Sequence, residues 1–265
     1  SAYSPLLDRE NIQSSNLCGS CHDIVTPKGV HLEQTFAEWK ASVFAKPEPD
    51  KQQTCGNCHT KGRDDVAAEA PNVVLRRVHD HQMVGVDVAI TEFPEMEAQK
   101  QRIQRELNTV VLAVLCVREV EGKPEIEISL ENQGAGHSWP SGATLDRRAW
   151  LELIAYDVDG AILLESGVVA DGQPVDDLED PNLWTFGSTA TDEEGNPAHF
   201  FWEVANLTST LLPAANPLPI TDPDFVDNHQ YRTYRYDGPL PDSVSIRVRV
   251  RPLALSLLDD LIEDR

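Results

Sequence analysis

The sequence lacks the features that would place it in a membrane or on nucleic acid. It has no run of about 18 apolar residues, so we expect no transmembrane helix. Basic residues are scarce, because 22 lysines and arginines stand against 44 acidic residues, which gives a formal charge of −22. A chain this acidic repels phosphate backbones, which excludes electrostatic binding of DNA or RNA. The same charge would steer the protein toward partners with basic surfaces.

Cysteine is also rare, but four of the five cysteines form two matching motifs. The motifs read Cys18-Gly-Ser-Cys21-His22 and Cys55-Gly-Asn-Cys58-His59. Each is C-x-x-C-H, the attachment sequence of a c-type haem. The two thiols bond to one edge of the porphyrin, and the histidine directly after them becomes an axial ligand of the iron. The sequence therefore predicts two covalently bound haem c groups.

Paired cysteines can also bind zinc, act as a redox dithiol or form a disulfide, and the histidine after each pair helps to distinguish haem attachment from these uses. Four thiolates can hold one zinc ion, but such a site needs no histidine after each pair and usually has a shorter gap between pairs. A redox dithiol is expected near a βαβ unit, and a disulfide across two residues is tight. The doubled histidine favours haem over these alternatives. The fifth cysteine, Cys116, lies in an apolar run and is expected to be a small core residue.

A haem iron with one histidine ligand has a sixth position, and the ligand there decides its chemistry. His79 and His81 follow the second motif and would point to opposite faces of an extended segment, so each could serve a different iron. His137 lies in a loop rich in glycine and proline, which suits a ligand presented from another part of the chain. We therefore expect sixth ligands among these three histidines. Met83 and His31 are alternatives, and His199 and His229 are expected to be structural.

Hydrophobic periodicity divides the chain into two parts. Before residue 107 it predicts loop over 1–31, a helix over about 33–45 and a polar helix over 94–107. After that, apolar and alternating runs predict strands over 109–120, 125–131, 148–158, 161–169, 198–204, 229–236 and 244–250. Residues 171–197 are rich in Asp, Gly and Pro, which predicts a surface excursion, and a short helix is expected over 253–262. We expect an α+β protein, with a small, mostly helical and loop dihaem cytochrome c domain over 1–107. An antiparallel β-sandwich with a short C-terminal helix follows over 108–265.

Taken together, these motifs resemble the multihaem c-type cytochrome family. The matching pieces are the two haem motifs, Thr35–Ser42, His79-x-His81 with Gly85, the Gly136-His137-Ser-Trp-Pro-Ser-Gly142 loop, Arg148–Leu151 and Asp157–Gly160. The resemblance implies bis-histidine haems, export from the cytoplasm and electron transfer.

We therefore expect a dihaem electron carrier rather than an enzyme, acting on redox protein partners alone or as a subunit of a larger cytochrome complex. The alternative is a haem enzyme of the peroxidase or nitrogen-oxide reductase type, which needs one iron with an open sixth position. Covalent haem attachment normally takes place outside the cytoplasm, so a periplasmic or extracellular location is expected. No signal segment is visible at Ser1.

Overall fold

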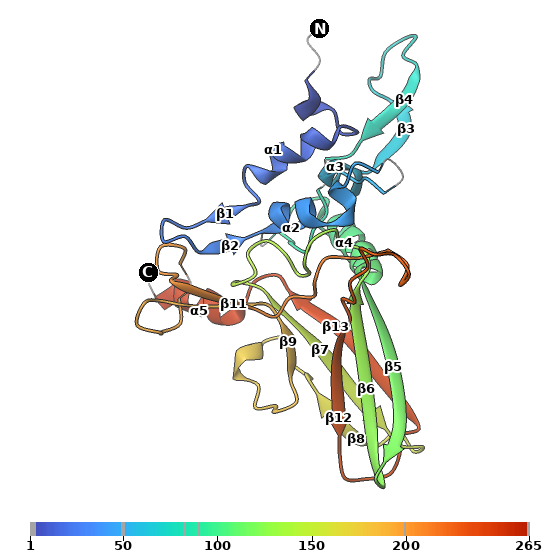
Figure 1. Ribbon diagram of the computed structural model, residues 1–265, viewed down its shortest axis with the longest axis vertical. Coiled ribbons are helices and arrows are strands. Elements are labelled where there is room, and N and C mark those ends of the chain that lie inside the picture. The colour runs from blue at the N-terminus through green and yellow to red at the C-terminus, as the bar shows by residue number, and fades with distance from the viewer. Residues whose placement is uncertain (1–3, 49–50, 82, 90, 199, 264–265) are drawn as a thin grey trace.

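The computed structural model describes residues 4–48, 51–81, 83–89, 91–198 and 200–263. Short helices and hairpins that carry both C-x-x-C-H motifs gather at one end of the molecule, and long strands extend away from them (Figure 1). The chain is mostly β, with several antiparallel sheets and few helices, consistent with the expected α+β class. His199 lies outside the described residues.

Three of the four motif cysteines lie on helices of little more than one turn, and Cys21 lies in the turn after the first of these helices. Cys18 is on α1 (Ser15–Gly19), and the second motif forms α3 (Cys55–His59). The expected loop over 1–31 is therefore wrong in part, since η1 (Pro5–Leu7) and η2 (Ile12–Ser14) precede α1. These elements are too short to show a helical repeat of apolar residues, so periodicity could not predict them.

The helix expected over about 33–45 is present as α2 (Thr35–Ala41) followed by η3 (Val43–Ala45). Two small hairpins flank this region, one formed by β1 (Ile24–Val25) and β2 (His31–Glu33), the other by β3 (Gly62–Val66) and β4 (Leu75–His79). The second hairpin was not predicted, because its strands are largely charged and exposed and lack an alternating apolar face.

The predicted polar helix is α4 (Met96–Val110), which lies between the short helices and hairpins at one end of the molecule and the long strands (Figure 1). Ile103 is its one buried residue among those described. The helix runs directly into β5 (Val111–Val120), because Val111 at its C-cap already has extended backbone angles. Among the helices in the described ranges, none combines the length and hydrophobicity that crossing a bilayer requires.

Two larger antiparallel sheets follow. The first has the order β12 (Gln230–Arg235), β6 (Lys123–Asn132), β5. The second has the order β13 (Ser243–Arg251), β7 (Arg148–Tyr156), β8 (Ile162–Ser166), with β9 (Trp184–Phe186) also paired to β7. A separate pair is formed by β10 (Ser188–Thr191) and β11 (Asn206–Ser209), and α5 (Leu255–Glu263) follows β13.

One hydrophobic core joins the two larger sheets. Ile126, Ile128 and Leu130 of β6 are fully buried and share a cluster with Leu151 and Leu153 of β7. Alternate residues of β13 pack against the same cluster, namely Val244, Ile246, Val248 and Val250. The alternation of apolar and polar residues predicted for this strand is therefore confirmed.

Two expectations for the later part of the chain are wrong. The segment 171–197 is not a surface excursion, since it contains η4 (Val175–Asp177) and strands β9 and β10, and Val175 and Phe186 are buried. No strand covers 198–204 in the described residues, where the chain bends and turns before β11. Buried residues separated by polar ones gave no regular period in either segment, so pattern alone could not place them.

Cys116 is exposed rather than buried in the core. Its neighbours Leu115 and Val117 are also exposed, at 36% and 38%, as is most of β5. The strand lies at the edge of its sheet and pairs with β6 on one side. Its apolar run therefore did not mark a buried strand.

Candidate haem site

The two motif helices lie against each other. Ser15 of α1 is fully buried, and its hydroxyl accepts a hydrogen bond from the backbone N–H of Cys55 at 3.1 Å. The thiols of Cys18 and Cys55 are neighbours: burial, followed by the nearby Cys55, raises the pKa of Cys18. Two haems attached through these motifs would therefore be bound at neighbouring places in the structure.

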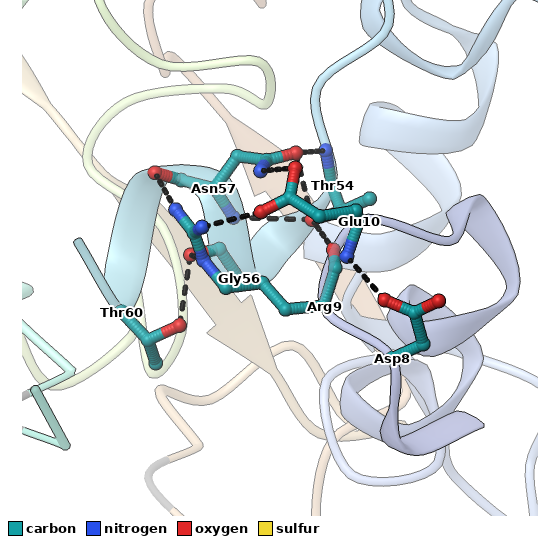
Figure 2. A network of polar contacts seen from close by, with 7 residues as sticks. All are labelled: Asp8, Arg9, Glu10, Thr54, Gly56, Asn57 and Thr60. Carbon is teal, nitrogen blue, oxygen red and sulfur yellow. Dashed lines mark hydrogen bonds and ion pairs between the residues drawn. The ribbon is translucent and has the colours of Figure 1, made fainter. Parts of the chain in front are cut away.

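The segment before the first motif anchors the second one (Figure 2). The Arg9 guanidinium donates to the carbonyls of Gly56 and Asn57, at 2.8 and 3.3 Å. Thr54 caps α3 by accepting from the Asn57 backbone N–H, and its own N–H donates to the Asn57 side chain at 2.8 Å. Its hydroxyl also donates to the Arg9 carbonyl at 2.7 Å. A helix of five residues is marginal alone, so these contacts fix its position.

Three candidate iron ligands share one hydrogen-bond pattern. The Nδ1 atom of His22 contacts Glu33 Oε1 at 2.8 Å, that of His59 contacts the Val84 carbonyl at 2.8 Å, and that of His137 contacts the Ser138 carbonyl at 2.9 Å. A carbonyl or carboxylate oxygen can only accept, so each Nδ1 donates, and Nε2 is the ring nitrogen left to bind a metal. Metal-bound histidines are oriented in this way by their outer partners.

The rings of His59 and His137 lie close together and nearly parallel. Their ring centres are 6.4 Å apart and their planes differ by 13°. Metal–histidine nitrogen bonds are about 2.0–2.1 Å, and the ring centre lies about 1.1 Å further out, so two imidazoles on opposite sides of one metal have centres about 6.3 Å apart. Burial, followed by the nearby His59 and His22, lowers the pKa of His137 and favours the neutral ring that metals bind. These residues fit an iron with two histidine ligands.

Asn132 and Glu38 hold the loop that presents His137. Asn132 is fully buried, and its amide nitrogen lies 3.2, 2.8 and 3.0 Å from the carbonyls of Ala135, His137 and Pro213. Its carbonyl accepts from the Ala135 N–H at 2.9 Å, and Glu38 accepts from the Ser138 N–H at 2.9 Å. Sequence reasoning missed both residues. Asn132 did carry a signal, because it occupies the next inward position after three buried apolar residues of β6.

The other candidate ligands are not brought into such a pair. His79 ends β4, and its Nδ1 is buried without a hydrogen-bond partner among the described residues. His81, His31 and Met83 are exposed. The ring contacts of the described chain pair His59 with His137 and include neither His79 nor His81. His229 contacts Asp227 and Glu131, in keeping with a structural residue.

The arrangement of the thiols also bears on the zinc alternative. Within the described ranges, no group of three or more His, Cys, Asp or Glu side chains lies close enough together to hold a metal ion between them. The four motif cysteines therefore do not form a four-thiolate site in this structure.

Comparison with known proteins gives one relevant similarity. No family model and no curated protein sequence matches the chain. Among solved structures, it is similar to a penta-heme cytochrome c552 from Thermochromatium tepidum, with a TM-score of 0.55 and 22% sequence identity. The alignment covers 94% of this chain and 51% of that one, so the chain spans about half the length of that cytochrome. The chain therefore has a fold like that of a multihaem c-type cytochrome.

Proposed function

We propose that the chain is a dihaem c-type cytochrome that transfers electrons. Cys18 and Cys21 would hold one haem, with His22 below its iron, and Cys55 and Cys58 the other, with His59 below its iron. The spacing of the nearly parallel rings of His59 and His137 carries the proposal, with centres 6.4 Å apart and both Nδ1 atoms bonded to backbone carbonyls. The fold it shares with a multihaem cytochrome supports it.

His59 and His137 would be the two axial ligands of the second iron. An iron with both axial positions filled by histidine has no place for a substrate, so it cycles between ferric and ferrous states as a carrier. For the first iron, His22 would be one ligand, and His79 or His81 the other. The contact between Cys18 and Cys55 supports two haem edges close enough for electrons to pass between them.

The same proposal assigns roles to the two parts of the chain. Residues 1–107 would form the dihaem domain, and residues 108–265 a β-sandwich that supplies His137. The charge of −22 suits docking on a basic face of a redox partner or a larger cytochrome complex. Because covalent haem attachment takes place outside the cytoplasm, the protein would be periplasmic or extracellular.

A second candidate is a haem enzyme with an open site at the first iron. The observation that favours it is the ring of His22, which faces no second histidine among the ring contacts of the described residues. A peroxidase or nitrogen-oxide reductase would use that open position. Cyanide or nitrite that shifts the spectrum of the oxidised protein would favour this candidate, and an unchanged spectrum would favour the carrier.

Counting the attached haems tests the proposal. Denaturing mass spectrometry and the pyridine haemochrome assay should find two haems on the protein expressed with a c-type maturation system. The double variant Cys55→Ser with Cys58→Ser should retain one. The control Cys116→Ser should retain both, because this exposed cysteine belongs to neither motif. Protein without covalent haem under these conditions would refute the proposal.

A further inference from the structure

We infer that Glu33 is a positioning residue that lowers the reduction potential of the haem held by His22 below that of the haem held by His59. This inference rests on the proposed dihaem function. It concerns a difference between the two sites that neither the motifs nor the fold implies.

Glu33 is built into the site rather than free on the surface. Its side chain is 11% exposed, whereas the ring of His22 is 60% exposed. It lies at the end of β2, opposite Ile24 of β1, so the hairpin brings it back to the chain just after the first motif. The backbone N–H of Phe36 donates to the His22 carbonyl at 3.0 Å, which also holds the start of α2 next to the first motif.

A second contact orients the Glu33 carboxylate. The Thr35 hydroxyl lies 3.2 Å from Glu33 Oε1, the same oxygen that contacts His22. That hydroxyl also contacts the Ser141 hydroxyl at 2.5 Å, in the loop that presents His137. One line of hydrogen bonds thus runs from the His22 ring to the loop that serves the other site.

The two sites differ in the charge behind the ligand ring. His22 donates to a carboxylate, whereas His59 and His137 donate to neutral backbone carbonyls. A hydrogen bond to an ionised acceptor is stronger than one to a neutral acceptor. The hydrogen bond to Glu33 would make the His22 imidazole a stronger electron donor to a bound iron. The negative charge of the carboxylate would also favour the ferric state over the ferrous state.

The carboxylate of Glu33 would therefore make the haem held by His22 harder to reduce than the haem held by His59, whose ligand contacts a neutral carbonyl.

A spectroelectrochemical titration of Glu33→Gln tests the inference. This variant keeps the size of the side chain and an acceptor oxygen but removes the charge. The lower of the two reduction potentials should rise by about 59 mV or more, which is a tenfold change in the ferric–ferrous equilibrium for one electron, and the higher potential should stay unchanged. Thr35→Val, which removes only the orienting hydroxyl, should move the same potential in the same direction by less. It provides the readout if Glu33→Gln folds poorly.

The control is Asp23→Asn, which removes a carboxylate next to His22 in the chain but leaves the contact to Glu33. It should give a smaller shift. An equal shift in Asp23→Asn would overturn the inference. So would no shift in Glu33→Gln, a shift of both potentials together, or a shift of the higher potential alone. Protein that carries two haems but shows one of these results refutes the role of Glu33 alone, whereas protein without covalent haem refutes the proposed function.

Discussion

Replacing Asn132 by alanine should release the loop that presents His137. The substitution removes an amide that lies within hydrogen-bond distance of three carbonyls and one N–H, which belong to Ala135, His137 and Pro213. No other described side chain joins these three points, since Glu38 contacts only the next residue, Ser138. The loop would therefore lose this side-chain link, while its backbone hydrogen bonds to Leu212 and Ala215 remain.

The cost follows from the hydrogen bonds that are lost. A typical intramolecular hydrogen bond contributes about 1 kcal/mol, and leaving a buried polar group without a partner costs about 1–3 kcal/mol. The loop is partly buried, so water can reach some of the freed carbonyls. We expect a loss of about 2–4 kcal/mol in the free energy of unfolding. This is a large part of the roughly 5–15 kcal/mol that stabilises a typical domain.

Urea unfolding followed by far-UV circular dichroism measures this loss, and the visible spectrum reports the iron. If His137 is a ligand, its displacement should convert one haem from low spin to high spin at urea concentrations below the main transition. The matched control is Asn206→Ala, because Asn206 is exposed and should change stability by less than about 0.5 kcal/mol. A loss below about 1 kcal/mol in Asn132→Ala, with an unchanged spectrum, would refute the reasoning.

Three further predictions concern the ligand, the core and alkaline pH. His137→Ala should make one haem high-spin and able to bind cyanide, whereas His229→Ala should not; visible spectra of both variants check this, and unchanged spin in the first would contradict the ligand role. Leu151→Ala should cost about 2–5 kcal/mol, because this side chain is fully buried. Val158→Ala, at 81% exposure, should be nearly neutral in the same urea assay, and equal costs would contradict the assigned core. Burial raises the pKa of Tyr234 from 10.0 to about 12. The unfolded chain therefore loses this proton first, and stability should fall between pH 10 and pH 12. Tyr234→Phe should remove that part of the fall, and an identical pH profile would argue against it.

The regular elements could be predicted where one face of the element is buried. The strand β13 repeats its apolar residues at the two-residue spacing of a strand, so its limits fell within a residue of the prediction. The hairpin of β3 and β4 and the short helices could not be predicted, because their stability comes from contacts such as that of Arg9 with α3.

The candidate site shows the same division. The cysteines and histidines of the two C-x-x-C-H motifs could be predicted, because their spacing in the sequence is enough to identify them. The loop rich in glycine and proline made His137 a candidate. Its proximity to His59 could not be predicted, since it depends on how the loop after β6 packs on α3 and the segment around Val84. The contact of Glu33 with His22 also needs the β1–β2 hairpin, whose strands are too short to show a pattern. Ligation by His79 or His81 stays a prediction.

The most direct test of the account is low-temperature electron paramagnetic resonance of the oxidised protein. Two irons, each held between two imidazoles, should give two low-spin ferric signals in equal amounts and no high-spin signal. Samples with no haem signal would contradict covalent attachment at Cys18–His22 and Cys55–His59. A high-spin signal as strong as one haem would contradict the electron carrier and leave the haem enzyme.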